Sequence, residues 1–121
     1  MLVDDLYTTR AIRITPKGFD ADISFDETHE IYKAHFPGNP ITPGVCMLEV
    51  CKQLLERHTA CTLFMKTVKN IKFLQVIVPN RDQFVTFIVQ WTQTDNEVSA
   101  QVIIQNDEVC FAKISIIYAI V

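Results

Sequence analysis

The sequence predicts an α+β domain in which an antiparallel β-sheet curls around one central helix. Strand-like segments open the chain, a single helix follows, and almost all of the remaining residues again have the periodicity of strands. The helix is apolar around most of its circumference, which requires that it be buried. Because an antiparallel sheet is the only other element, wrapping the sheet around the helix is the economical way to bury it.

The first half of the chain contains two strands, a loop and the helix. Residues 6–15 are expected to form the first strand, which ends at a Pro-Lys-Gly turn. In residues 19–26, Phe, Ala and Ile alternate with Asp and Ser, and this period of two predicts a half-buried strand. Residues 27–44 predict a long ordered loop. The helix is then expected over residues 44–58.

The second half is nearly all strand. Residues 62–78 predict one long, bent strand that ends at a Pro-Asn-Arg-Asp turn. Residues 83–93 predict the next strand, and segments 97–105 and 108–120 predict a final hairpin around an Asn-Asp pair, which is typical of turns. A single copy of this arrangement leaves sheet edges and the far side of the helix exposed, so we expect dimerisation.

The composition is that of one globular domain spanning residues 1–121. Hydrophobic residues make up 49% of the chain and charged residues 21%, and no linker or repeat interrupts it. The net charge of −3 gives no indication of nucleic-acid binding. The apolar runs are too short to span a bilayer, and two acids near the start stand where a signal peptide carries positive charge. We therefore expect a cytoplasmic protein without membrane insertion.

The cysteines do not have the spacing of a metal site. None forms a Cys-x-x-Cys pair, and all lie among apolar residues: Cys46, Cys51, Cys61 and Cys110. We expect them to be small buried hydrophobic side chains in a reducing compartment, with no bound metal and no cofactor.

The segment HFPGNPITPGVCMLEVCKQL, residues 35–54, brings three chemically useful groups together. Three prolines restrict the backbone between His35 and Gly44. A Pro-Gly pair opens the helix and leaves unpaired N–H groups at the positive end of its dipole, where a developing oxyanion can bind. Glu49 follows in the second turn. A base, an oxyanion site and a carboxyl group are what proton removal next to a thioester carbonyl requires, coupled to loss of a β-hydroxyl.

Spacing alone leaves a simpler interpretation open. Four polar residues of the helix fall at i, i+3, i+4 and i+7, the pattern of an ordinary stripe facing water: Glu49, Lys52, Gln53 and Glu56. A single histidine in a loop is more often hydrogen-bonded or solvated than catalytic. His29 and His58 have no supporting neighbours in the sequence, and we expect both on the surface.

The same segment resembles the active-site segment of the β-hydroxyacyl-acyl-carrier-protein dehydratases, which share the hotdog fold. The family pattern is G-H-F-P-G-x-P-x-x-P-G-V-L-x-x-E, with a glutamine four residues after the acid. The matching residues, all in register, are His35, Phe36, Pro37, Gly38, Pro40, Pro43, Gly44, Val45, Glu49 and Gln53. A weaker similarity extends from Phe19 to the C-terminus.

The resemblance implies an active site and a reaction. His35 would abstract the α-proton of a 3-hydroxyacyl thioester, and the Gly44 N–H would bond the thioester carbonyl. Glu49, contributed by the partner subunit, would protonate the departing hydroxyl or orient the water, giving a trans-2-enoyl thioester. The residues expected to contact the substrate are Phe36, Pro37, Gly38, Val45 and Gln53.

The resemblance also implies partners and a pathway class. The substrate would arrive on the phosphopantetheine arm of an acyl-carrier protein, in fatty-acid or related polyene- or polyketide-like biosynthesis. A homodimer or higher oligomer with shared active sites is expected. Three lysines and one arginine could form a basic docking patch for the carrier, although solvated side chains are the simpler interpretation: Lys66, Lys69, Lys72 and Arg81.

Two departures from the family pattern bear on these expectations. Ala34 stands where the family has glycine, next to the histidine. Only about seven residues precede the first strand, so the family's N-terminal helix and tunnel-gating segment are expected to be absent, and acyl specificity does not carry over. An aryl or polyene intermediate is one expectation for the acyl group. Phe36, Phe73 and Met47 could line the tunnel or lie in the core, and the core is the commoner place for any one such side chain.

Two other functions remain open at this point. A non-catalytic hotdog subunit, or a carrier-binding module, would keep the fold in order to pair with an active partner. A hotdog acyl thioesterase would use Glu49 to activate water instead of handling a hydroxyl group. The His-Phe-Pro-Gly segment argues against the thioesterase, because thioesterases of this fold usually lack it.

Overall fold

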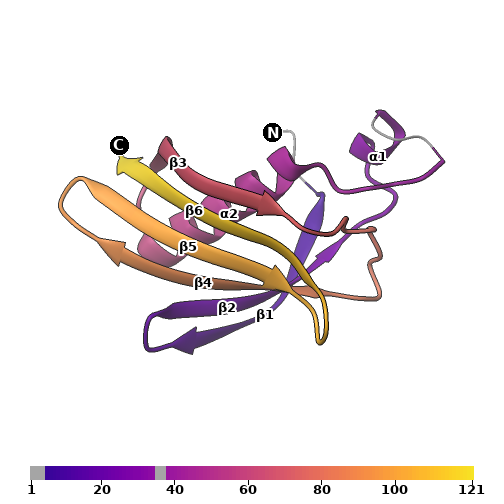
Figure 1. Ribbon diagram of the computed structural model, residues 1–121, viewed down its shortest axis with the longest axis horizontal. Helices are drawn as coiled ribbons and strands as arrows, with labels where there is room; N and C mark the ends of the chain where they lie inside the picture. The colour runs from indigo at the N-terminus through magenta and orange to yellow at the C-terminus, as the bar shows by residue number, and fades with distance from the viewer. Residues whose placement is uncertain (1–4, 35–37) are drawn as a thin grey trace.

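The computed structural model describes residues 5–34 and 38–121, and it contains a six-stranded antiparallel sheet that curls around helix α2 (Gly44–Thr59). In Figure 1 the sheet lies across the length of this helix, with α2 behind it. The strand order is β1-β2-β4-β5-β6-β3. The predicted α+β architecture, with a sheet around one long helix, is therefore confirmed.

The elements follow one another in the predicted order. The strands are β1 (Tyr7–Thr15), β2 (Gly18–Phe25), β3 (Leu63–Phe73), β4 (Val85–Gln93), β5 (Glu97–Gln105) and β6 (Cys110–Ile120). Three tight connections join consecutive antiparallel neighbours, namely β1 to β2, β4 to β5 and β5 to β6. The first strand, β1, and the strand that follows the helix, β3, form the two edges of the sheet.

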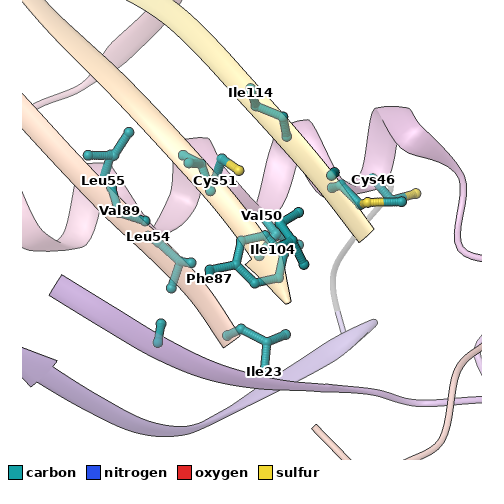
Figure 2. Close-up of a cluster of buried hydrophobic side chains, with 14 of the residues drawn as sticks. Ile23, Cys46, Val50, Cys51, Leu54, Leu55, Phe87, Val89, Ile104 and Ile114 are labelled. Atoms are coloured by element: carbon teal, nitrogen blue, oxygen red, sulfur yellow. The ribbon is translucent and has the colours of Figure 1, made fainter. Parts of the chain in front are cut away.

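The core lies between α2 and the concave face of the sheet. Figure 2 shows helix residues Val50 and Leu54 near Phe87 of β4 and Ile104 of β5. The buried side chains of the helix are Cys46, Met47, Val50, Cys51, Leu54 and Leu55. Burying a leucine or valine side chain stabilises the fold by roughly 1.5–3 kcal/mol. The helix was predicted to be buried around most of its circumference, but 60% of the surface of Val45 is exposed.

Strand β3 is shorter and more irregular than predicted. The single strand expected over residues 62–78 ends at Phe73, because the chain turns away there and the Leu74 N–H bonds the Phe111 carbonyl at 2.8 Å. Register shifts leave Lys66 and Lys69 without a partner on β6, so each is the extra residue of a β-bulge. Bulges are common in edge strands, where they oppose unwanted pairing.

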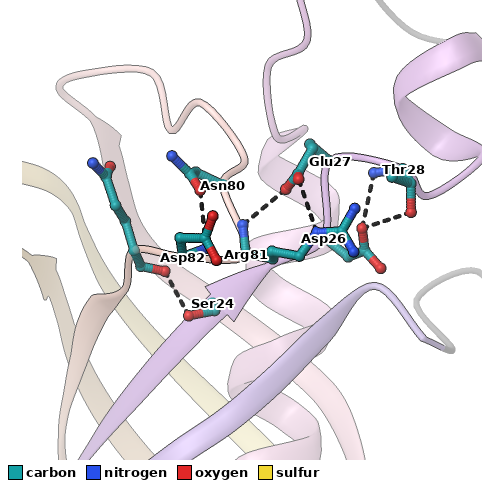
Figure 3. A network of polar contacts seen from close by, with 8 residues as sticks. Ser24, Asp26, Glu27, Thr28, Asn80, Arg81 and Asp82 are labelled. Atoms are coloured by element: carbon teal, nitrogen blue, oxygen red, sulfur yellow. Dashed lines mark hydrogen bonds and ion pairs between the residues drawn. The ribbon is translucent and has the colours of Figure 1, made fainter.

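The predicted loop over residues 27–44 contains a short helix, α1 (Ile31–Ala34). An ion pair and a hydrogen bond connect the region at the start of this segment to the turn before β4 (Figure 3). Glu27 pairs with Arg81 at 3.0 Å, and the Ser24 hydroxyl donates to the Gln83 carbonyl at 2.5 Å. The Asp26 carboxylate accepts bonds from the backbone N–H and the hydroxyl of Thr28.

Strand β2 is covered on both faces, whereas the sequence pattern predicted a half-buried strand. Asp22 and Ser24 point away from the core and are nevertheless buried. Arg13 of β1 covers Asp22 and bonds both carboxylate oxygens, at 2.7 and 2.8 Å, and the Thr86 hydroxyl adds a third bond at 2.9 Å. Side chains from the two flanking strands therefore exclude water from the outer face.

The described part of the chain contains no helix long and apolar enough to cross a membrane. The described residues also contain no cluster of His, Cys, Asp and Glu that could hold a metal ion. The cysteines are free thiols, with Cys46 and Cys51 buried as predicted and Cys61 and Cys110 half-buried. Burial raises the pKa of the Cys51 thiol to about 12, which keeps it protonated and unreactive. The single-domain boundary at 1–121 stays a prediction.

Candidate active site

The start of α2 presents backbone donors. Pro43 precedes the helix with an extended backbone (φ −62°, ψ 145°) and has no side chain that could cap it. Its carbonyl accepts the N–H groups of Cys46 and Met47, at 3.0 and 3.4 Å. Among the described residues, the N–H groups of Gly44 and Val45 form no hydrogen bond. These two donors lie at the positive end of the helix dipole, where they could bind an oxyanion.

At the first position of the helix, glycine leaves room for an aromatic ring that lies against the backbone. A Cβ atom placed on Gly44 would be 2.6 Å from Cζ of Phe73, the last residue of β3. Half of the Phe73 surface is exposed, so this side chain is not the core residue that we expected. Met47 is buried, as predicted. The ring of Phe73 therefore forms an apolar wall beside the free N–H groups.

Glu49 does not face water as a simple polar stripe would. It is half-buried, and its Oε1 atom is shielded from solvent without a hydrogen bond among the described residues. Burial of an unpaired carboxylate oxygen is unfavourable, and such groups in folded proteins usually have a functional reason. Lys52, Gln53 and Glu56 are also half-buried. The Glu56 carboxylate accepts the Leu63 N–H at 2.9 Å, so it connects α2 to the start of β3.

Gln53 has partners that the sequence did not predict. The Tyr7 hydroxyl donates to Gln53 Oε1 at 2.6 Å, and Arg57 donates to the same hydroxyl at 2.5 Å. The sequence does place Arg57 near Gln53, because it follows Gln53 by four residues and residues at i and i+4 share a helix face. No pattern in the sequence pointed to Tyr7, which comes from the opposite edge of the sheet.

The three motif residues His35, Phe36 and Pro37 lie outside the described residues. Residues before and after this segment are fixed by hydrogen bonds. Tyr32, at 4% exposure in α1, shares a 2.9 Å hydrogen bond with the hydroxyl of Thr42. The Thr42 N–H in turn bonds the Ile77 carbonyl at 2.9 Å. Burial raises the pKa of Tyr32 to about 12, so this phenol stays protonated and the bond persists across the neutral range.

Two further motif residues are described. Gly38 is exposed and has φ of +83°, a backbone conformation that side-chain-bearing residues rarely adopt. Ala34, which departs from the family glycine, ends α1 with a helical backbone and an exposed methyl group. Alanine takes up that conformation without strain, so the departure imposes no backbone penalty.

The two other histidines were expected on the surface, and His29 is instead half-buried. His29 Nδ1 accepts the Ile31 N–H at 3.0 Å, at the start of α1. His58 is exposed, as predicted, but its ring lies 4.5 Å from that of Phe19 and 5.6 Å from that of Trp91. Both histidines therefore have local structural roles.

Solved structures with the same architecture define the fold class. The dehydratase heterocomplex ApeI:P from Xenorhabdus doucetiae superposes with a TM-score of 0.71 over 93% of this chain and 96% of the other, at 14% identity. A Lactococcus lactis protein, yhdA, provisionally assigned as a thioesterase, superposes with a TM-score of 0.69 over 100% and 97%, at 13% identity. The protein has the hotdog fold.

Sequence comparison then gives the family. Residues 11–113 match the ApeI-like family model, described as ApeI dehydratase, and the chain belongs to this family. A 3-hydroxyacyl-acyl-carrier-protein dehydratase FabZ of Clostridium acetobutylicum is 35% identical over 65 residues, which are 48% of this chain and 45% of the relative. The FabZ of Lactobacillus helveticus is 27% identical over 97 residues, 73% of this chain and 65% of the relative. The matches thus span about half to two thirds of the curated relatives.

Proposed function

We propose that the protein dehydrates a 3-hydroxyacyl thioester carried on an acyl-carrier protein, giving the trans-2-enoyl thioester and water. The observation that carries this proposal is the pair of unsatisfied groups on α2 within a matching motif. Within the described residues, the helix offers free N–H donors at Gly44 and Val45 and a shielded, unpaired carboxyl oxygen at Glu49. Each complements a group of the substrate, the thioester oxygen and the 3-hydroxyl.

The proposed reaction divides the proton transfers between two residues. His35 removes the proton from C2, and the electron pair moves toward the thioester oxygen, which the Gly44 N–H stabilises as negative charge develops. Collapse of this enolate forms the C2–C3 double bond and breaks the C3–O bond. Glu49 supplies the proton with which the hydroxyl leaves as water. Transfer of a proton from His35 back to Glu49 restores the resting state.

A second copy of the chain is needed to complete the proposed site. Phe64 and Val68 are 66% and 45% exposed on the edge strand β3, and Val45 and Phe73 are exposed beside the start of α2. An apolar edge strand of this kind is a template for pairing. Pairing two β3 edges would cover these side chains. It would also bring Glu49 of one copy to the loop and helix start of the other.

The acyl-carrier protein would be recognised by lysines on the outer face of the sheet. Lys66 and Arg81, two members of the expected patch, are paired with Glu97 and Glu27. Lys72 instead stands directly opposite Lys113 of β6, and within the described residues neither forms an ion pair. Like charges at opposed positions are destabilising, and an acidic partner would offset this cost.

The docking proposal is tested with a charge-reversed variant, Lys72→Glu with Lys113→Glu. Its kcat/KM should fall about tenfold or more with carrier-bound substrate and stay near the wild-type value with a pantetheine thioester. Lys17→Glu, in the turn between β1 and β2, is the matched control, and it should leave both values unchanged. Equal losses with both substrates would contradict docking at this surface.

The dehydration itself is tested by mass spectrometry of a panel of 3-hydroxyacyl carrier thioesters of different chain types. The wild-type chain should remove one water from at least one substrate, whereas His35→Ala and Glu49→Gln should remove none. The acyl group that reacts would identify the substrate class. No water loss from any substrate, with a folded dimer, would contradict the proposal.

One observation favours an alternative function, that of a non-catalytic subunit. The structural relative from Xenorhabdus doucetiae is a heterocomplex, so a member of this fold can assemble with a different chain. The same mass-spectrometric experiment separates the two functions. A chain that acts only as a partner would be inactive alone, and it would raise the activity of a second hotdog protein when the two are mixed.

A further inference from the structure

The Tyr7 hydroxyl lies between two side chains of α2. It accepts a hydrogen bond from Arg57 Nη2 and donates one to Gln53 Oε1, with lengths of 2.5 and 2.6 Å. The Arg57 guanidinium also lies 5.8 Å from the centre of the Tyr7 ring. Tyr7 is the first residue of β1, so these contacts join the edge strand to the polar stripe of the helix.

The chemistry of the three groups fixes the direction of both bonds. A guanidinium can only donate, so the Tyr7 oxygen must accept from Arg57. The single phenolic proton is then directed to Gln53, which must present its carbonyl oxygen to Tyr7. The amide NH₂ group of Gln53 is consequently turned away from Tyr7, and its two donors remain for another acceptor.

An acceptor without a partner among the described residues lies one helical turn before Gln53. Glu49 precedes Gln53 by four residues, which places both on one face of α2. Its Oε1 atom is shielded and has no hydrogen bond among the described residues. Burial raises the pKa of Tyr7, although the Arg57 guanidinium opposes this effect. Tyr7 therefore keeps its proton at neutral pH, and the orientation of the amide is maintained.

We infer that Tyr7 is a positioning residue, which holds the Gln53 amide so that its NH₂ group is presented toward Glu49. An N–H bond to one carboxyl oxygen of Glu49 would require that the transferable proton reside on the other oxygen. The acidic O–H would thus be directed at the leaving hydroxyl of the substrate. This inference rests on the proposed dehydration for its catalytic consequence, but the orientation of Gln53 can be measured without any turnover.

The orientation is tested by NMR of the Gln53 side-chain amide in ¹⁵N-labelled protein. Its two proton signals, identified by their loss in Gln53→Glu, should be well separated and protected in the wild type. In Tyr7→Phe they should move toward the values of a solvent-exposed glutamine, and Arg57→Met should shift them in the same direction. A Gln53 amide that is unchanged in Tyr7→Phe would overturn the inference, whether or not the protein is an enzyme.

The consequence for catalysis is tested with a double-mutant cycle. Tyr7→Phe should lower kcat about tenfold with little change in KM, and in a Gln53→Ala background it should cause no further loss. Ser24→Ala removes another buried hydroxyl bond, far from α2, and should lower Tm without lowering kcat. If the losses in kcat caused by Tyr7→Phe and Gln53→Ala are instead additive, Tyr7 does not act through Gln53 and the contact is only structural. An inactive wild type would refute the dehydration proposal and leave the NMR result to decide the orientation.

Discussion

Gly44 is the residue whose replacement best separates activity from stability. The clash that a Cβ atom would cause is with the tip of the Phe73 ring, and this ring is half exposed and free to move outward. We predict that Gly44→Ala lowers the free energy of unfolding by no more than about 1 kcal/mol. Turnover should fall by at least tenfold, because the displaced ring and the altered helix start disturb the proposed oxyanion donors.

A second substitution, at Phe73, should restore part of the turnover that Gly44→Ala loses. Phe73→Ala removes the atoms that a Cβ at residue 44 would meet, so the double variant should recover part of the lost turnover. Steady-state kinetics and thermal unfolding of the two single variants and the double variant measure this directly. Wild-type turnover in Gly44→Ala, with the same Tm, would contradict the importance of the close approach.

Asp22 provides a prediction for the pH dependence of stability. Hydrogen bonding from Arg13 holds the pKa of the Asp22 carboxyl below its ordinary value, and a bond from Thr86 contributes in the same direction. Because the folded-state pKa is lower than the unfolded one, the stabilisation is present at neutral pH. It is lost as the pH falls through about 4 and below.

The test for Asp22 is the variant Asp22→Asn, which cannot titrate. It should be less stable than the wild type by about 1–2 kcal/mol at pH 7, since a charged partner of Arg13 is lost. Chemical unfolding at a series of pH values should show the difference shrinking below pH 4. A constant difference between pH 7 and pH 3 would mean that this carboxyl does not contribute to acid sensitivity.

At the scale of the elements, the C-terminus of α2 is under local backbone strain. Ala60, the residue that caps the C-terminus of the helix, has φ 56° and ψ 31°, a left-handed conformation that glycine adopts far more readily. We predict that Ala60→Gly raises the free energy of unfolding by about 1 kcal/mol. Ala34→Gly is the matched control at the end of α1, where the backbone is helical, and it should lower stability slightly. Thermal unfolding of both variants tests this, and the prediction fails if both move Tm in the same direction.

The regular elements were predictable because each has a strong local pattern. The apolar residues of the helix and the alternation in β4, β5 and β6 reflect burial against one core, so periodicity identified them. Residues 74–78 have the same β-branched composition as a strand, yet they leave the sheet. Their exit depends on where the partner strand β6 begins, with Leu74 bonded to Phe111. A pattern confined to one segment does not contain that information.

The motif predicts the candidate site, but it contains no indication of the contacts that support Gly44 and Gln53. Gly44 and Glu49 were singled out by the resemblance of residues 35–54 to the active-site segment of the dehydratase family. The contact of Phe73 with Gly44 and that of Tyr7 with Gln53 join residues that are 29 and 46 positions apart. Such contacts are determined by strand order and sheet curvature, and a single sequence without its fold contains no direct record of them.

At the scale of the whole molecule, one copy leaves the surface beside the proposed site uncovered. The start of α2 and the edge strand β3 expose Val45, Val68 and Phe73, while Glu49 has a shielded oxygen without a hydrogen bond among the described residues. An isolated chain would expose the apolar groups to water at a cost in free energy. In the proposed dimer the same residues become the walls of two sites that share both copies. Association and catalysis are then inseparable properties of one surface.

The shared site leads to a prediction that depends on mixing inactive proteins. His35→Ala lacks the proposed base and Glu49→Gln lacks the proposed acid, so each homodimer should be inactive. If His35 of one copy works with Glu49 of the other, a mixed dimer contains one site with both groups intact and one with neither. Random reassociation of equal amounts gives half mixed dimers, so activity should return to about a quarter of the wild-type value. The measurement is turnover after the two variants are unfolded together and refolded, with each variant refolded alone as the control. No recovery from a mixture that demonstrably exchanges subunits would place the base and the acid of each site in the same chain.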